Sequence, residues 1–93
     1  MIVAHSVYAR AEDVVSCELE GGSALLDLNS SMYFRLNDTA HFVWEALGDK
    51  PLSPDQIADA LVEHYTVEKE DCLPDVLAIL TELKSARLIT EKA

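Results

Sequence analysis

Hydrophobic residues in the first half of the chain occur in short runs separated by polar residues and glycine. The three clearest runs are Val14–Leu19, Ala24–Leu28 and Met32–Leu36. Short β-prone runs bounded by Gly, Asn and Ser are typical of strands joined by tight turns. We therefore expect an antiparallel meander whose third strand lies at an edge of the sheet. Asn29 is expected to supply the positive φ of the second turn.

The residues after the third run predict a helix that begins without a linker. Asn37 has a side chain typical of a helix N-cap. The apolar residues that follow have the spacing of an amphipathic helix. We expect this helix to bury Phe42, Val43 and Leu47 and to carry Trp44 at one margin.

Two more helices are predicted in the second half of the chain. Ser53–Gln56 combines a Ser cap, a Pro at the first helical position and a Gln that completes a capping box. A third helix is expected from residue 68 or 69 to Ser85. Pro74 indicates either a start near that residue or a kink, because proline lacks the N–H that the helix needs. Residues 88–90 then form a short terminal strand or tail. The predicted fold class is α+β, a three-stranded antiparallel meander followed by three α-helices, with a winged helix-turn-helix outline.

The chain length is that of a single domain. Its 93 residues, 49% of them hydrophobic, are enough for one core but few for an enclosed active site. Residues 1–12 are expected to be a tail or an extra edge strand around Ile2–Tyr8, and residues 13–90 the folded domain. The first segment contains no apolar run long enough for a signal peptide or a membrane span, so we expect a cytoplasmic protein without a membrane partner.

The charge of the chain argues against nucleic acid. There are 17 acidic and 7 basic residues, a formal net charge of −10. A winged-helix protein that binds DNA needs Lys and Arg to neutralise phosphates. The predicted third helix has only Lys69, Lys84 and Arg87 as cations, against five carboxylates. An acidic winged-helix domain that regulates by binding a protein remains an alternative.

No catalytic motif stands out. The sequence has no glycine-rich phosphate loop, and Cys17 and Cys72 are interpreted as reduced structural thiols. His41 and Glu45 stand four residues apart on a predicted helix, a spacing that suits a metal ion but more often marks a solvated contact. We therefore expect a protein that is not an enzyme and that holds no metal or cofactor.

The apolar face of the third helix has two interpretations. Its apolar residues cover about half of the helical wheel at about 100° per residue, and a core-facing stripe needs roughly 100°. The whole arc can be core, with Lys84 and Arg87 stabilising the helix C-terminus. Alternatively, one margin of the arc lines a groove with basic residues at one end. The arc consists of Leu73, Val76, Leu77, Ile79, Leu80, Leu83 and Ala86.

The segment LLDLNSSMYFRLNDTAHFVWEAL resembles the strand–turn–strand–helix segment of the PqqD-like family, also called RiPP recognition elements. RiPPs are ribosomally made and post-translationally modified peptides. The resemblance extends over Val14–Ile89 and is greatest to the stand-alone members of lasso-peptide pathways. Ser31 and Arg87 stand where the family has glycine. The resemblance is carried by Leu26-Asp27, Tyr33, Leu36-Asn37, Trp44, Asp75-Val76, Leu80, Leu83 and Leu88-Ile89.

The resemblance implies a leader-binding protein. In this family the leader of a precursor peptide adds as a strand beside the third strand, against the last helix, which is β-augmentation. The implied partners are that leader and a maturation enzyme, with the leader peptidase of a lasso-peptide pathway expected first. A chaperone for a radical-SAM enzyme, as in pyrroloquinoline quinone synthesis, is the alternative within the family. The chain is expected to be a monomer or a weak homodimer. Tyr33 and Trp44 are assigned to a pocket rim or to the core. The implied peptide-binding residues are Met32, Tyr33, Phe34, Arg35, Leu36, Val76, Ile79, Leu80, Leu83 and Lys84.

Overall fold

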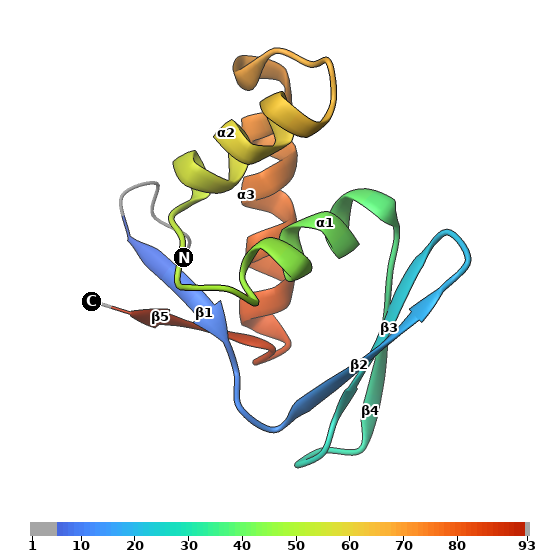
Figure 1. The fold of residues 1–93 in the computed structure, drawn as a ribbon. Helices are drawn as coiled ribbons and strands as arrows, with labels where there is room; N and C mark the ends of the chain where they lie inside the picture. Colours follow the sequence, from blue (N-terminus) through green and yellow to red (C-terminus); the bar gives the residue numbers. More distant parts are fainter. Residues whose placement is uncertain (1–5, 93) are drawn as a thin grey trace.

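Two antiparallel sheets and three helices make up residues 6–92, the part of the chain that the computed structural model describes (Figure 1). The larger sheet has the order β2-β3-β4. This confirms the predicted α+β fold, the meander and the edge position of its third strand. The elements in chain order are β1 (Val7–Arg10), β2 (Val14–Leu19), β3 (Gly22–Asp27), β4 (Met32–Leu36), α1 (Asp38–Ala46), α2 (Pro54–His64), α3 (Lys69–Ser85) and β5 (Ile89–Lys92).

The second sheet joins the two ends of the described chain. β1 pairs antiparallel with β5, with Ala9 opposite Thr90, and Tyr8 also bridges to Leu52. Of the strand expected around Ile2–Tyr8, residues 2–5 lie outside the described residues. The strand that is present pairs with the end of the chain and not with the meander, and the side chain of Tyr8 is fully buried.

The two faces of the meander have different surroundings. The face that carries Leu25 and Leu36 packs on the helices, where both side chains are buried. The opposite face carries Val15 and Tyr33, which lie across from Leu26 on either side and are exposed. The sheet therefore covers the core with one face and leaves the other face to solvent.

The helices begin where the sequence predicts. Asn37 Oδ1 accepts a hydrogen bond from the Ala40 N–H at 2.9 Å, and Ser53 and Gln56 form a reciprocal capping box. α3 runs from Lys69 to Ser85, as expected, and continues through Pro74, so a later start near Pro74 is excluded. The prediction that Trp44 lies at a margin of α1 is wrong.

Trp44 belongs to the core, and only 1% of its surface is exposed. The guanidinium of Arg10 lies over its ring, 4.5 Å from the centroid. Arg10 also donates from Nε and Nη2 to the Trp44 carbonyl at 2.9 and 2.7 Å. The Arg10 side chain thus covers the Trp44 ring, a contact that a wheel drawn for α1 alone does not include.

Two tight turns place a non-glycine residue in the left-handed conformation. Ser31, with φ 62°, closes the β3–β4 turn, so the assignment of the positive φ to Asn29 is wrong. The Asn29 N–H instead donates to Asp27 Oδ1 at 2.9 Å. Arg87, with φ 63°, follows α3. No helix among residues 6–92 is both long enough and apolar enough to cross a membrane.

Candidate functional site

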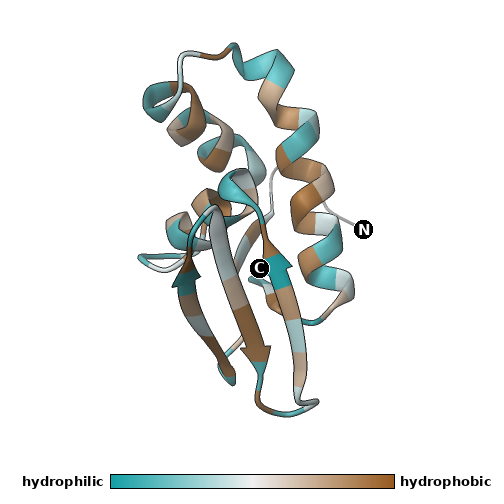
Figure 2. Cartoon of the chain, turned by 90° about the vertical axis from the view of Figure 1, so that its right-hand side faces the viewer, coloured by the Kyte–Doolittle hydropathy of each residue, from teal (hydrophilic) through white to brown (hydrophobic). Residues whose placement is uncertain are grey.

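The outer edge of β4 pairs with no described strand. β4 ends at Asn37, where α1 begins, and Figure 2 shows it as the strand nearest to α3. An open strand edge presents a row of backbone N–H and C=O groups that another extended chain can pair with. The edge of β4 carries neither Pro nor Lys, the residues that usually protect such edges.

A groove lies between the start of α1 and one side of α3, beside the end of β4. Its volume is about 330 Å³. The α3 residues of this groove recur at i, i+3, i+4 and i+7, so they form one stripe of the helix. Ala78 and Ile79 lie between the two carboxylates of the stripe. The groove is lined by Asn37, Thr39, Asp75, Ala78, Ile79 and Glu82.

The core takes most of the apolar arc of α3. Val76 and Leu80 are 0% exposed and Leu83 is 3% exposed, so their side chains cannot line an open groove. This corrects the expectation that a peptide lies against these three residues. Ile79 is half-buried, packs against the core and also lines the groove.

Lys84 lies away from the groove, which corrects its assignment as a groove residue. It is nine residues after Asp75, and at about 100° per residue this places it on the opposite side of α3. Its Nζ lies 3.5 Å from Glu91 Oε1 on β5 and 5.9 Å from the centroid of the Tyr8 ring. Both carboxylates of the groove, Asp75 and Glu82, make no ion pair with another described residue.

The residues expected on β4 divide between its two faces. Leu36 is buried and Phe34 packs partly against the core, whereas Met32 is 56% exposed. Tyr33, 73% exposed, and Arg35 point to the open face of the sheet. Tyr33 is therefore free to contact a partner, and Trp44 is not.

The sequence interpretation did not assign Asp75, Ala78 and Glu82 to the site, although Asp75 is among the residues that carry the family resemblance. Their i, i+3 and i+7 spacing on α3 can be read from the sequence. The groove was instead assigned to the apolar arc beside this stripe, most of which belongs to the core. A second hollow, of about 210 Å³, adjoins the groove and shares Thr39 and Asp75 with it. It reaches Leu61 and Tyr65 on the α2 side.

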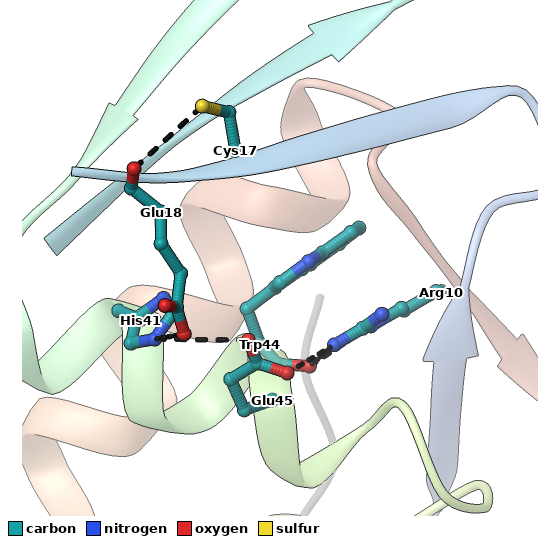
Figure 3. Close-up of polar contacts among 6 residues, drawn as sticks. All are labelled: Arg10, Cys17, Glu18, His41, Trp44 and Glu45. Atoms are coloured by element: carbon teal, nitrogen blue, oxygen red, sulfur yellow. Dashed lines mark hydrogen bonds and ion pairs between the residues drawn. The ribbon is translucent and has the colours of Figure 1, made fainter.

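Three possible metal ligands meet between β2 and α1 (Figure 3). One side-chain atom each of Glu18, His41 and Glu45 lies within 4.8 Å of the others, and His41 Nε2 is 3.7 Å from a carboxylate oxygen of both glutamates. Arg10 also contacts Glu45, at 3.2 Å. These are ion-pair distances, and His41 Nδ1 has no described hydrogen-bond partner to fix the ring as metal-binding histidines require. The expected absence of a metal stays a prediction.

Neither cysteine lines the groove. Cys17 is exposed on β2, and its Sγ lies 3.6 Å from the Glu18 carbonyl. Cys72 is buried in α3, with its Sγ 3.8 Å from the Ala58 carbonyl. The pKa of Lys69 is raised mainly by its hydrogen bond to Asp59. Lys69 does not line the groove.

Fold and groove together define a class: a small α+β domain with a winged-helix outline that keeps one strand edge open beside a helix. The family model for coenzyme PQQ synthesis protein D (PqqD) matches residues 22–89. The chain belongs to the PqqD family, which confirms the resemblance seen in the sequence. A comparison with curated proteins gave no match.

Solved structures of similar proteins cover nearly the whole chain. One is described as TbiB1 in complex with the TbiA(beta) leader peptide, with 26% identity and a TM-score of 0.80 over 91% of this chain and 98% of that chain. Another is a lasso peptide synthetase B1 complexed with the leader peptide, with 31% identity and a TM-score of 0.75 over 89% and 96% of the two chains.

A third similar structure shows the fold alone. It is the PqqD truncation of Methylobacterium extorquens PqqCD, described as a functional, stand-alone RiPP recognition element. Its identity is 23% and its TM-score 0.79 over 97% of this chain and 95% of that chain.

Proposed function

We propose that this protein binds the leader segment of a precursor peptide by adding it as a strand to β4. It then delivers the precursor to a maturation enzyme, the separate leader peptidase of a lasso-peptide pathway, and has no catalytic role itself. One observation carries the proposal: two similar chains, matched over 98% and 96% of their lengths, are complexed with a leader peptide. The open edge of β4 beside the groove gives this chain the means to do the same.

The energetics of strand addition suit this role. An extended peptide satisfies the free backbone groups of β4, and each hydrogen bond contributes about 0.5–1.5 kcal/mol net. Its alternate side chains point either to the groove or to the open face beside Tyr33 and Arg35. Apolar burial on Ile79 and Phe34 adds about 25 cal/mol per Å². Several such terms exceed the ordering cost of a short peptide and support sub-micromolar affinity.

The proposed contact set differs from the one that the sequence implied. The backbone of β4 remains at its centre, with Met32, Tyr33 and Arg35 exposed along it. Of the apolar residues assigned to α3, Ile79 remains, because the others are core residues. Arg35 stays in the proposal as a partner for acidic leader residues on the open face.

Titration with the leader of the precursor encoded beside this gene tests the proposal. We expect a dissociation constant below 1 μM, which corresponds to a binding free energy more favourable than about −8 kcal/mol. The core segment of the same precursor, without its leader, serves as the control and should not bind. On addition of leader, amide hydrogen exchange should slow along β4 and hardly change along β2, the other edge of the sheet.

Two outcomes would contradict this assignment. Protection along β2 instead of β4 would show that the wrong edge was chosen. Tight binding of the leader without protection on either strand would exclude strand addition as the mode of recognition.

For delivery, we expect the neighbouring leader peptidase to cleave its precursor faster when this protein is present. Equal rates with and without the protein would argue against that partner.

A further inference from the structure

The negative charge of the groove predicts what kind of peptide the groove accepts. The charged residues in its lining are Asp75 and Glu82, and both are acidic. The adjoining hollow adds no further charge, since Asp75 is its charged residue as well. The sequence interpretation placed cations here, but Lys84 lies on the opposite side of α3 and pairs with Glu91.

We propose that Asp75 and Glu82 make the groove selective for basic peptides. The inference rests on the proposed function, because it describes the leader that the β4 edge takes up. The occupant is an extended peptide with an apolar residue over Ala78 and Ile79 and a Lys or Arg on either side of it.

The spacing of the two carboxylates sets the spacing of the basic residues. Asp75 and Glu82 are seven residues apart, or about 10 Å along the helix axis at 1.5 Å per residue. An extended peptide places a side chain on the same face about every 6.7 Å. Basic residues two positions before and after the central apolar residue lie about 13 Å apart, and their flexible side chains can close the difference. The geometry points to the pattern basic-x-apolar-x-basic.

The surroundings of the groove support this preference. Neither carboxylate is neutralised by a described cation, so a basic peptide meets two unpaired acceptors. Asp38 lies in the first turn of α1, where it offsets the positive end of the short helix beside the groove. An acidic peptide would place like charges together in a partly enclosed groove, which costs affinity and slows association.

A random 15-residue peptide library, displayed as mRNA–peptide fusions, tests the selectivity without assuming a leader. Peptides selected on the unchanged protein should be enriched at least threefold in Lys and Arg at the positions two residues from a shared apolar residue. The enrichment should vanish on Asp75→Asn/Glu82→Gln and should turn to Asp and Glu on Asp75→Lys/Glu82→Lys. The matched control is Glu63→Gln/Glu70→Gln, which changes the net charge equally at exposed positions away from the groove and should select like the unchanged protein.

Amide hydrogen exchange with the most enriched peptide distinguishes a failure of the charge preference from a failure of leader binding at β4. Protection along β4 by peptides without basic enrichment would overturn the charge preference and leave leader binding in place. Basic enrichment that persists in Asp75→Asn/Glu82→Gln would overturn the assignment to these two residues. If no peptide family is enriched, or if the enriched peptides protect no part of β4, the proposed function fails and the charge preference fails with it. Circular dichroism confirms that each variant is folded.

Discussion

Ser31 and Arg87 hold left-handed backbone conformations that most side chains avoid, at a cost of about 1–2 kcal/mol each. Backbone hydrogen bonds hold both turns in this conformation. After α3, the Arg87 N–H donates to the Lys84 carbonyl at 3.0 Å and the Leu88 N–H to the Leu83 carbonyl at 2.9 Å. This is the Schellman arrangement, and it is completed by the burial of Leu88.

Replacing Arg87 by glycine should therefore stabilise the protein. Relief of the left-handed conformation outweighs the extra chain entropy of glycine, which is about 0.5–1 kcal/mol. We expect Arg87→Gly to raise the free energy of unfolding by ~0.5–1 kcal/mol, measured by urea denaturation. Arg87→Ala is the control, because it removes the charge and keeps Cβ; it should give no gain. An equal gain in both variants would assign the effect to charge.

At this scale the local sequence pattern predicted the caps but assigned the strained position of the hairpin to Asn29, whereas the family resemblance has its glycine at Ser31. Asn37, Ser53 and Gln56 act through bonds to residues three positions away, so local pattern is sufficient. Asn29 is the better intrinsic left-handed residue, but its N–H is engaged by the side chain of Asp27. The strain then falls on Ser31, whose N–H closes the turn to the Asp27 carbonyl at 2.8 Å.

On the scale of elements, α3 serves two surfaces with adjacent stripes. One stripe, with Val76 and Leu80, completes the core, and its neighbour, with Asp75 and Glu82, lines the groove. Ile79 lies between them and contributes to both. A substitution on α3 therefore affects stability, binding or both according to its position around the helix.

Two alanine substitutions on neighbouring residues should separate these effects. Leu80→Ala leaves a cavity in the core and should lower the free energy of unfolding by ~2–5 kcal/mol. Ile79→Ala removes a half-buried side chain, and we expect a loss of ~1 kcal/mol or less together with at least threefold weaker leader binding. Chemical denaturation and leader titration measure the two quantities. Unchanged binding by Ile79→Ala would remove Ile79 from the proposed contact set.

The sequence could not show which stripe of α3 faces the groove. Its apolar arc is wider than the core requires, and the position of the core face depends on how α1 and the sheet pack against α3. The strands and helices themselves were predictable because each has its own local pattern and turn residues. Lys84 was misplaced for the same reason, since its partner Glu91 belongs to a strand that forms only in the complete fold.

At the scale of the whole molecule, the β1–β5 sheet and Arg10 connect the two ends of the described chain to each other and to α1. Residues paired in this sheet, such as Ala9 and Thr90, are distant in sequence, so short-range pattern carries no information about them. Arg10 connects the sheet to the helical layer through Trp44 and Glu45 (Figure 3). Its side chain is 29% exposed, which makes these contacts partly shielded from water.

Arg10→Met should destabilise the protein while keeping most of the aliphatic packing. Hydrogen bonds from a charged group contribute about 1.5–3 kcal/mol, and partial exposure reduces that range to an expected loss of ~1–2 kcal/mol in urea denaturation. Arg10→Lys keeps the charge without the two-nitrogen geometry and should lose an intermediate amount. A loss below about 0.5 kcal/mol for Arg10→Met would show that Arg10 lies on the surface without supporting the fold.

The winged-helix outline alone does not predict DNA binding. The net charge is −10 and the third helix is acidic, so the protein offers few cations to neutralise phosphates. We expect no retention of duplex DNA in a mobility-shift assay at about 0.15 M salt. Micromolar retention that weakens as salt rises would contradict this expectation.

The pairing of β1 with β5 also has a consequence for the order of events during synthesis. Val7–Arg10 is translated some 80 residues before its partner strand. The meander and α1 have all their mutual contacts available long before that point, whereas β1 must wait with Tyr8 uncovered. The nascent chain therefore displays the edge of β4 before α3 exists to form the other wall of the groove. A growing chain is exposed to mispairing at that edge until the last helix has been made.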